Sequence, residues 1–442
     1  MATRSIPSVS ILDFFANAKL ILRNPLPFHR KNFERLGDTF QIKVSLSETV
    51  VISRDPELAQ YALQNNHKNF TKSPIQTEEV AKYVGHGLLT IEGETWRKQR
   101  RLIQPAFHKD NIIQLLDTVQ QAINVELDKI TPARAFNVFP VFNDLAFQVV
   151  VKSLFSSAAG QEDIGRLQYI TEATQRMVVK ELRQFYKKWW FHLSGSIKNH
   201  KDLTQEARKI LKDIVENRRA SGKRENDLLD LLLDARYDDG SPMSEQQLLD
   251  EILILFTAGH ETTSNALTFT AELLARHPEV QEKIFQEVTE AGKETASRFE
   301  FLQRCSYTKN VIEEAMRLYP PAYFIDRVNL TEDEFQGLKI PKGSSLLFSM
   351  YEIHRHKDHW QDPEAFIPER FAQERTEHYY PFGAGPRKCI GNNFAMYEMI
   401  LAVAELMRRF RIEPKTGPIE VDPLITLKPK NAVLKFLLRK EE

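Results

Sequence analysis

The feature that most constrains the fold of this chain is a long stretch of helical spacing at residues 246–276. Apolar residues recur there three and four positions apart, and the pattern ends at His277 and Pro278. At about 1.5 Å per residue such a helix runs roughly 45 Å, which is enough to cross a whole domain. The run Ile252–Phe256 in its first half is apolar nearly all round, so we expect this half to be buried.

The other patterns favour a mainly α protein with a small β region. Helical spacing is found at residues 94–106, 113–130, 205–219, 308–318 and 392–410. Short strand-like runs lie toward the two ends, at Phe40–Ile52, Lys339–Phe348 and Leu434–Leu438. The chain has 442 residues, 42% of them hydrophobic, and no linker, repeat or low-complexity tract interrupts it. We therefore predict a single domain over residues 1–442.

Composition excludes several classes of function. The 60 Lys and Arg residues balance the 60 Asp and Glu residues, so the chain lacks the basic excess that nucleic acid binding needs. Cys305 and Cys389 are too few for a disulfide framework, a four-thiolate cluster or a structural zinc site, and they fit a reducing compartment. The apolar stretch Ile11–Phe15 contains Asp13 and is far shorter than a spanning helix. We predict no nucleic acid partner, no transmembrane segment and a cytoplasmic location.

The most informative stretch is FGAGPRKCIG at residues 382–391. Gly383, Gly385 and Pro386 make a compact loop that can bring backbone N–H groups close to a ligand. Cys389 lies between this loop and a helix predicted to start near Asn392, and a helix N-terminus with nearby cations favours the thiolate. A lone cysteine before a helix is more often a buried structural residue, so the loop alone leaves that alternative open.

This stretch resembles the cysteine loop of the cytochrome P-450 family at Phe382, Gly385, Arg387, Cys389 and Gly391. The resemblance implies a triangular, mostly helical prism with a minor β-sheet lobe. It also implies a haem b whose iron is held by the thiolate of Cys389, which favours O–O cleavage. By the same resemblance Arg387 contacts a haem propionate, and Phe382 and Gly391 belong to the haem-binding loop.

Three charged residues match a structural network of the same family. Glu314 and Arg317 are three apart on a predicted helix, a spacing that an exposed ion pair worth under about 1 kcal/mol explains equally well. They also match the family's E-x-x-R pair, and Arg370 in Pro368–Phe371 matches the arginine that completes a Glu–Arg–Arg network. We expect the three to be structural, with buried charge left unpaired when one is removed.

Further cations are assigned by resemblance to the haem propionates. Trp96 and Arg100 share one face of the helix predicted at residues 94–106 and match the family's W-x-x-x-R segment, and Arg327 is the third candidate. Arginine suits this role because its fork can bind a carboxylate with two hydrogen bonds. Other cations nearby are either a solvated face or a docking surface for an acidic electron donor: Arg97, Lys98, Arg101 and Lys109.

A polar motif, AGHETT at residues 258–263, interrupts the apolar centre of the long helix. Gly259 costs roughly 1 kcal/mol against alanine inside a helix. Glutamate and threonine are also poor choices for a core, and such conflicts with folding tend to mark function. The alternative is an ordinary helix whose polar face reaches solvent.

This motif resembles the oxygen-binding segment of the cytochrome P-450 family. The small residue Ala258 and Gly259 begin it, and Gly259 would leave room for O2. Thr262 would hydrogen-bond the dioxygen and Glu261 would relay protons through water. We interpret His260 as a hydrogen-bonded or surface residue rather than a metal ligand.

The resemblance implies a haem-dependent monooxygenase that inserts one atom of O2 into a C–H bond. No G-x-G-x-x-G unit or flavin domain accompanies the motifs, so electrons are expected from a separate ferredoxin or flavodoxin with its NAD(P)H reductase. A peroxide-driven or rearranging haem-thiolate enzyme is a first alternative, although such relatives typically lack the acid–alcohol pair. A haem-binding sensor or carrier is a second, with little use for Glu261 and Thr262.

The substrate is the least constrained part of the prediction. By family analogy the pocket draws on residues 73–89, 177–190, 256–263, 322–325 and 424–427. An apolar wall there would suit fatty acids, terpenoids or carotenoids: Tyr323, Phe324, Leu424, Ile425 and Val84. The segment Arg183–His192 mixes rings with cations, as a packed amphipathic lid helix or a lid for a polar or anionic substrate would. C-hydroxylation and O-demethylation of a methoxylated substrate both remain open.

Overall fold

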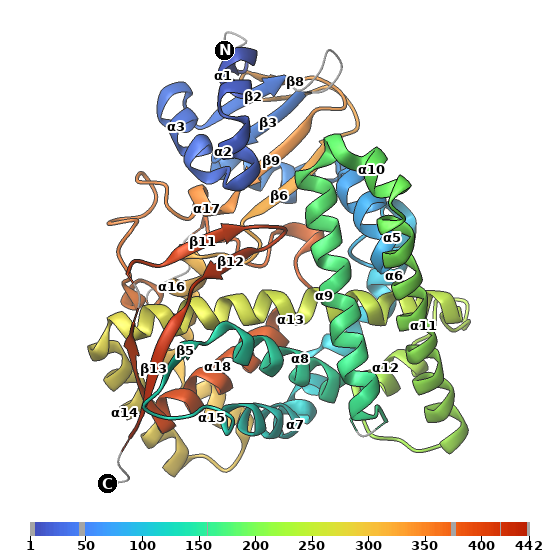
Figure 1. Ribbon diagram of the computed structural model, residues 1–442, viewed down its shortest axis with the longest axis vertical. Coiled ribbons are helices and arrows are strands. Elements are labelled where there is room, and N and C mark those ends of the chain that lie inside the picture. Colours follow the sequence, from blue (N-terminus) through green and yellow to red (C-terminus); the bar gives the residue numbers. More distant parts are fainter. Residues whose placement is uncertain (1–4, 44–48, 157, 373–376, 416, 440–442) are drawn as a thin grey trace. The chain divides into compact units, whose positions relative to one another are not determined.

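Helices form most of the structure, a computed structural model that describes residues 5–43, 49–156, 158–372, 377–415 and 417–439. The chain divides into two compact units, each assembled from segments distant in sequence (Figure 1). The first unit comprises Met1–Ser73, Glu313–Cys389 and Glu420–Lys430. The second comprises Pro74–Ile312, Ile390–Ile419 and Asn431–Glu442.

A six-stranded sheet organises the first unit, with the strand order β1-β2-β3-β9-β6-β4. Its strands are β1 (Ser8–Val9), β2 (Thr39–Lys43), β3 (Thr49–Ser53), β9 (Ser345–Ser349), β6 (Phe324–Asn329) and β4 (Phe70–Thr71). The parallel β3–β9 pair sets Val51 opposite Leu346, and both side chains are buried in one apolar core. This sheet joins strands almost 300 residues apart and holds β6, which carries Arg327.

Short elements complete the first unit. Its helices and turns are α1 (Ile11–Ala16), α2 (Ala18–Arg23), α3 (Leu26–Leu36), α4 (Pro56–Gln60), η1 (Tyr61–Asn65), η2 (His67–Asn69), α17 (Met350–Ile353), η6 (Pro368–Phe371) and η7 (Gly385–Arg387). Two hairpins belong to it, β7 (Asp333–Phe335) with β8 (Leu338–Ile340) and β11 (Glu420–Pro423) with β12 (Leu427–Lys430). The predicted run Phe40–Ile52 covers β2 and β3, and its residues 44–48 lie outside the described part of the chain.

Helix α13 (Glu245–Arg276) is the longest element of the second unit. It begins where Ser244 Oγ accepts a hydrogen bond from Gln247 N, and it ends at His277 before Pro278, as the sequence predicts. Along its length it packs against α8 (Phe139–Phe155), with the rings of Phe147 and Phe256 stacked at 5.7 Å. The predicted bounds 246–276 therefore differ from the observed ones by one residue.

The rest of the second unit is largely helical. Its helices and turns are η3 (Ile75–Val80), α5 (Ala81–Val84), α6 (Gly93–Ile103), η4 (Gln104–Phe107), α7 (Lys109–Leu127), α9 (Gln161–Arg183), η5 (Phe185–Lys187), α10 (Lys188–Leu193), α11 (Ser196–Ser221), α12 (Leu228–Asp234), α14 (Pro278–Glu294), α15 (Arg298–Arg304) and α18 (Asn392–Arg409). A sheet of three strands joins β10 (Phe410–Pro414), β13 (Val433–Leu438) and β5 (Ala135–Asn137). Helix α16 (Ser306–Leu318) starts in the second unit and ends in the first.

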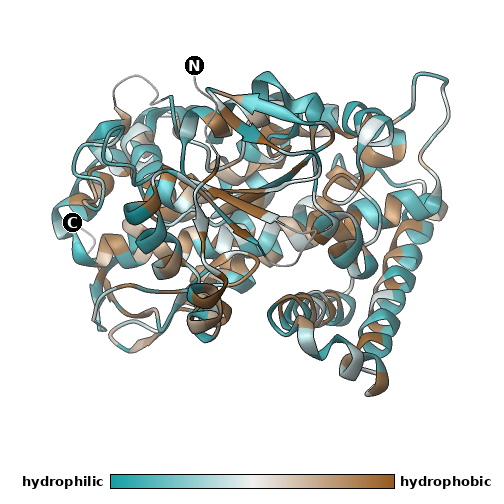
Figure 2. Ribbon diagram, turned by 90° about the horizontal axis from the view of Figure 1, so that it is seen from above, coloured by the Kyte–Doolittle hydropathy of each residue, from teal (hydrophilic) through white to brown (hydrophobic). Residues whose placement is uncertain are grey.

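Several of these helices alternate between hydrophilic and hydrophobic residues along their length, as Figure 2 shows. This alternation is typical of helices that bury one face. None of the helices in the described residues is long and apolar enough to cross a membrane. The mainly α fold with small sheets is confirmed, whereas the single-domain prediction stays a prediction.

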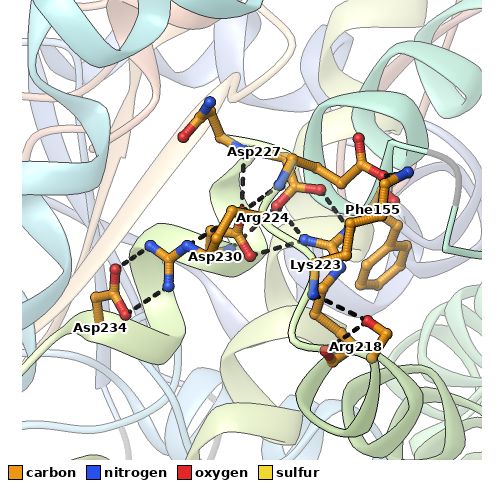
Figure 3. Close-up of polar contacts among 10 residues, drawn as sticks. Phe155, Arg218, Lys223, Arg224, Asp227, Asp230 and Asp234 are labelled. Carbon is orange, nitrogen blue, oxygen red and sulfur yellow. Dashed lines mark hydrogen bonds and ion pairs between the residues drawn. The ribbon is translucent and has the colours of Figure 1, made fainter.

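Each unit contains a buried arginine that binds several acceptors. In the second unit Arg218 of α11 forms ion pairs with Asp227 (2.7 Å) and Asp230 (2.8 Å), and it donates to Phe155 O (3.1 Å) (Figure 3). Asp227 also caps α12 by accepting a hydrogen bond from Asp230 N at 3.0 Å. The guanidinium therefore ties the ends of α8, α11 and α12 together.

In the first unit Arg317 uses all five of its donors. It pairs with Glu314 (2.7 and 2.9 Å), and both side chains are fully buried. Its remaining donors go to the backbone oxygens of His354 (2.8 Å), Pro363 (2.7 Å) and Ala365 (2.9 Å). The guanidinium thereby fixes a chain segment some 40 residues beyond it.

Arg370 joins this pair and completes the network of three. Its Nε donates to Glu314 Oε1 at 3.1 Å, and its Nη1 donates to Gln361 O at 3.0 Å. The backbone N–H of Ile367 is a further donor to Glu314 Oε1, at 2.9 Å. Spacing alone left an exposed pair as an alternative for Glu314 and Arg317, but in the structure both are buried.

We expect Arg317→Lys to cost about 3–5 kcal/mol of unfolding free energy, because lysine offers three donors to five buried acceptors. Arg370→Lys is the matched control and should cost about 1–2 kcal/mol, since that side chain reaches Glu314 through one hydrogen bond and is partly exposed. Urea unfolding followed by circular dichroism measures both values. Equal losses for the two variants would contradict the dependence on five satisfied donors.

Candidate functional site

Hydrogen bonds close the loop before Cys389 into a tight turn. Gly383 N donates to Tyr380 O (3.0 Å), and Lys388 N donates to Gly385 O (3.1 Å) at the turn η7. Cys389 N then donates to Phe382 O at 2.9 Å. Phe382 and Cys389 are thus adjacent across the loop, and α18 begins three residues after the cysteine.

Gly385 holds this loop against the turn η1. A Cβ atom on Gly385 would collide with Leu63 O and lie 2.9 Å from Leu63 C, so no side chain fits there. Its φ of +68° also favours glycine. Arg387, predicted to contact a haem propionate, donates from Nη1 to Phe70 O at 3.0 Å on the neighbouring strand β4. The loop is therefore positioned by backbone contacts within the first unit.

The two cysteines differ in exposure. Cys389 is exposed, whereas Cys305 between α15 and α16 is fully buried. Burial raises the pKa of the Cys305 thiol to about 12, and Glu287 nearby adds to this effect. A protonated, buried thiol is a poor metal ligand, so Cys389 is the cysteine that suits ligand binding.

In the second unit, four residues on one face of α13 are not fully buried, and Thr257 on another face is half-buried as well. Ala258 is exposed, and Leu255, Gly259 and Thr262 are half-buried. These positions are i, i+3, i+4 and i+7, so they share one face. Every residue from Thr263 to Ala275 is buried. We call these four residues the α13 stripe; it is apolar except for the hydroxyl of Thr262.

Two polar side chains of the predicted oxygen-binding motif, Thr262 and His260, are hydrogen-bonded within α13. Thr262 Oγ1 donates to Ala258 O at 2.8 Å, and its oxygen keeps its lone pairs for a further donor. His260 is buried, with Nδ1 2.7 Å from Phe256 O. Glu261 is also buried, at 5% exposure, directly beside the stripe. No group of three or more potential metal-binding side chains occurs among the described residues.

Gly259 has a packing reason that the sequence did not show. A Cβ atom at this position would lie 3.0 Å from Val150 Cγ2 of α8, which is tighter than ordinary contact. Glycine therefore allows α8 to lie close against α13. The predicted role of Gly259 in leaving room for O2 stays a prediction, and close helix packing is a second demand on the same residue.

The residues predicted to bind propionates occur in both units. Trp96 and Arg100 lie one turn apart on α6, both half-buried, and Arg100 Nε donates to Gln104 Oε1 at 3.3 Å. Arg327 is buried on β6, with Nη1 2.7 Å from Asp326 O. Gly391 precedes α18 as its N-cap residue in the second unit. The predicted set is thus distributed over α6, β6, the Cys389 loop and the start of α18.

The cations next to Trp96 have acidic neighbours on the same unit. Arg97 pairs with Glu94 (2.6 Å) and Arg101 pairs with Asp238 (2.7 Å), and all four side chains are exposed. Exposed pairs of this kind contribute little to stability. They also reduce the excess of positive charge that an acidic electron donor would meet.

Four of the five predicted pocket residues lie together in the first unit. Tyr323 is buried and its hydroxyl donates to Leu424 O at 2.6 Å, at the turn between β11 and β12. The rings of Tyr323 and Phe324 are 4.6 Å apart, and Ile425 in the same turn is 44% exposed. Val84 belongs to the second unit, where its buried side chain packs in a cluster with Phe191 and Ile254.

An acidic pair in α13, Asp250 and Glu251, is buried and was not predicted as functional from the sequence. Asp250 accepts a hydrogen bond from His86 N at 2.9 Å, and Glu251 accepts one from Leu88 N at 3.1 Å. These donors directly follow Val84, so the pair positions a segment predicted to contribute to the pocket. Two adjacent acids in an apolar run were the signal that could have revealed them.

Two glycines let this segment approach the acids. A Cβ atom on Gly85 would collide with the carboxylate of Asp250, and one on Gly87 would lie 2.7 Å from Glu251 Cδ. Burial raises the pKa of Glu251 to about 7, although the N–H of Leu88 and the amide of Gln247 partly oppose this. The segment at residues 85–88 is therefore in contact with a carboxyl group whose pKa is near neutral.

Comparison with known proteins identifies the chain. The sequence model of the cytochrome P450 family matches residues 7–436. The chain belongs to the cytochrome P450 family. Membership implies a monooxygenase that carries a haem on a cysteine thiolate and uses O2 with a small-molecule substrate.

Relatives of the P450 family align over most of the chain. Cyclooctat-9-en-7-ol 5-monooxygenase of Streptomyces melanosporofaciens is 30% identical over 89% of this chain and 86% of its own length. Pentalenene oxygenase of Streptomyces avermitilis is 27% identical over 89% and 88%. Cytochrome P450 4A12 of Rattus norvegicus is 30% identical over 80% and 75%.

Solved P450 structures share the fold. Retinoic acid bound cyanobacterial CYP120A1 has a TM-score of 0.84 at 24% identity and covers 99% of this chain and 100% of its own. The heme domain of cytochrome P450DA has the same TM-score at 23% identity, covering 100% and 99%. The family and fold that the cysteine loop predicted are therefore confirmed.

The donors of the first unit fit the haem of the P450 family. The exposed thiol of Cys389 can supply a thiolate to iron, and Arg387 and Arg327 can supply guanidinium groups to propionates. Gly385 keeps side-chain atoms out of the contact between this loop and η1. The first unit thus contains the thiol, the two arginines and the close approach of the loop backbone to η1.

We expect Gly385→Ala to unfold or displace the cysteine loop, because its Cβ would collide with Leu63 O. Gly383→Ala is the matched control: its φ is also positive, at +71°, but its Cβ would meet only Ile325 Cδ1 at 3.6 Å. Backbone strain alone should cost the control about 1–2 kcal/mol. Thermal unfolding and haem content of the purified proteins measure the difference, and similar values for both variants would exclude the proposed collision.

Glu251 should make stability depend on pH. Its pKa is about 7 in the folded chain against 4.5 ordinarily, so between these values the folded chain binds more protons. Its contribution to the unfolding free energy therefore falls as pH rises from 4.5 to 7 and is constant above. Glu251→Gln should remove a decline of roughly 2–3 kcal/mol.

Urea unfolding at pH 5, 6, 7 and 8 measures this decline as the difference between wild type and variant. The control is Glu94→Gln, whose side chain is exposed on α6 and which should follow the wild-type profile. A Glu251→Gln profile parallel to wild type across the whole range would show that this carboxyl is ionised throughout.

Proposed function

We propose that this chain is a haem b monooxygenase that hydroxylates a C–H bond of an apolar terpenoid, with Cys389 as the axial ligand. The observation that carries the proposal is the α13 stripe, which is accessible, apolar and carries a single hydroxyl. An apolar wall with one positioned polar group is the kind of surface that holds a hydrocarbon and orients it. The bound haem would supply the activation of O2, and the chain supplies orientation and protons.

Within the stripe, Thr262 is proposed to hold and pass on protons. Its hydroxyl oxygen can accept a proton or a hydrogen bond while its own hydrogen is directed to Ala258 O. Glu261, buried next to it, is the proposed source of protons through water. Proton supply at this face is what separates a monooxygenase from a haem carrier, which needs none.

The substrate class is inferred from two features. Leu255, Ala258 and Gly259 leave no charge on the stripe, and Tyr323 and Phe324 present rings in the first unit. Two of the aligned relatives are named for cyclooctat-9-en-7-ol and for pentalenene. A terpenoid therefore suits each of these two apolar surfaces, taken by itself, better than a methoxylated sugar, and hydroxylation is proposed ahead of O-demethylation.

Electrons are proposed to come from a separate ferredoxin or flavodoxin and its NAD(P)H reductase. The sequence contains no dinucleotide-binding G-x-G-x-x-G unit. The exposed cations of α6 are the proposed contact, with Lys98 beside the paired Arg97 and Arg101. Steering by such charges weakens as salt increases.

Spectra and turnover of three variants test the proposal. Cys389→Ser should lose the thiolate-type Soret band of the reduced carbon monoxide complex, whereas Cys305→Ala should keep it. Thr262→Ala should keep both the band and the bound substrate, but its product per NADPH consumed should fall about 10²-fold or more, the usual effect of losing a positioned proton donor. The substrate panel contains cyclic terpenes, fatty acids and methoxylated sugars.

The outcomes separate the parts of the proposal. A Soret shift with terpenes alone supports the substrate class, and formaldehyde release from a methoxylated compound would replace hydroxylation with O-demethylation. Unchanged coupling in Thr262→Ala would remove this residue from proton transfer. A thiolate band that survives in Cys389→Ser would refute the assigned ligand.

A further inference from the structure

Five large hydrophobic side chains are exposed within nine residues of the second unit. They lie on η5 and α10, the connection between α9 and α11 (Figure 1). More than half of each side chain is exposed: Phe185, Tyr186, Trp189, Trp190 and Leu193. Single exposed hydrophobics are normal, but a contiguous group of this kind marks an interaction site. We call residues 185–193 the aromatic segment.

One ring fixes the aromatic segment to the rest of its unit. Phe191 is 3% exposed and packs with Tyr83 and Ile254 in a buried cluster. Within the aromatic segment, which the structure describes completely, it is the one buried hydrophobic residue. The expectation that this segment packs on the protein therefore holds for Phe191, and the other rings are left outside. The exposed rings therefore belong to a segment that the buried Phe191 fixes to the folded protein.

The exposed rings contact one another. The ring centroids of Trp189 and Trp190 are 5.9 Å apart, and those of Phe185 and Tyr186 are 5.8 Å apart, both edge to face. Tryptophan and tyrosine carry a polar N–H or O–H on an apolar ring. A surface built from them suits a boundary between water and an apolar phase.

The charged side chains of the sequence around the aromatic segment are all basic. From residue 183 to residue 201 the sequence contains five Lys and Arg residues and no Asp or Glu, in a chain whose net charge is zero. Lys187 is exposed, with Nζ 5.8 Å from the ring centroid of Tyr186. Lys188 pairs with Glu79 at 2.6 Å and remains 48% exposed. Two adjacent lysines therefore lie between the two pairs of exposed rings in the aromatic segment.

We propose that the aromatic segment binds the surface of an anionic phospholipid bilayer. Tryptophan and tyrosine concentrate at the membrane–water interface, and short helices with rings on one side and cations beside them lie in its plane. Lysines near an anionic leaflet add attraction to the lipid phosphates. An acidic protein would satisfy the cations, but a bilayer also takes up four rings and a leucine without a complementary apolar surface. This inference does not depend on the proposed function.

Flotation of the full-length haem-loaded protein with vesicles tests the inference. One set of vesicles contains phosphatidylcholine and phosphatidylglycerol in equal parts, and the other contains phosphatidylcholine alone. Wild type should float with the mixed vesicles, and added salt should weaken this binding. The double variant Trp189→Ser and Trp190→Ser should lower the partition coefficient on the order of tenfold. Lys187→Gln should lower it about fivefold on mixed vesicles and not at all on neutral ones.

The matched control is Tyr169→Ser on α9. Tyr169 is also more than half exposed and lies beside a cation, with Arg166 Cζ 5.1 Å from its ring centroid, but it is outside the aromatic segment. This variant should bind as wild type does, and unchanged haem spectra should show that every variant is folded.

Three results would overturn the proposal. The first is a wild type that does not float with mixed vesicles, and the second is a Trp189→Ser, Trp190→Ser protein that floats as well as wild type. The third is a wild type that sediments as a dimer and does not bind vesicles, together with a double variant that sediments as a monomer. This result would assign the rings to contact with a second copy of this chain.

Discussion

A helix buried over most of its surface must satisfy the polar groups of its own side chains, and α13 satisfies several of them internally. Thr257, His260, Thr262, Thr268 and Thr270 each hydrogen-bond the carbonyl oxygen four residues earlier. Burying such groups without partners would cost free energy, so these bonds let the helix carry them through the core. The α13 stripe depends on this arrangement, because it is an accessible part of a helix that is otherwise mostly buried.

Each unit uses a buried arginine to hold distant parts of its chain together. Arg317 pairs with one carboxylate and binds three backbone oxygens, whereas Arg218 pairs with two carboxylates and binds one backbone oxygen at the end of α8. A planar guanidinium can bind several acceptors at once, which lysine cannot do. The Cys389 loop is held in a different way, by the close contact of Gly385 with η1.

Structural features that depend on residues close together in the sequence were predicted from sequence motifs. The extent of α13 followed from its apolar spacing and from Pro278, and the cysteine loop followed from its own residues. Helix α8 was missed because it is apolar nearly all round and so lacks a 3.6-residue period. The parallel pairing of β3 with β9 and the three carbonyl acceptors of Arg317 were also missed. Both depend on residues distant in sequence, whereas the spacing of Glu314 and Arg317 showed only their mutual contact.

The contact between Gly259 and Val150 links the α13 stripe to the neighbouring helix. Because a Cβ at position 259 would lie 3.0 Å from Val150 Cγ2, a larger residue there requires Val150 to shift by a few tenths of an ångström or a smaller residue to replace it. In evolutionary terms the two positions should covary, with alanine at 259 accompanied by alanine or glycine at 150. Selection for close packing of α8 against α13 thus also limits which residues can occur in the α13 stripe.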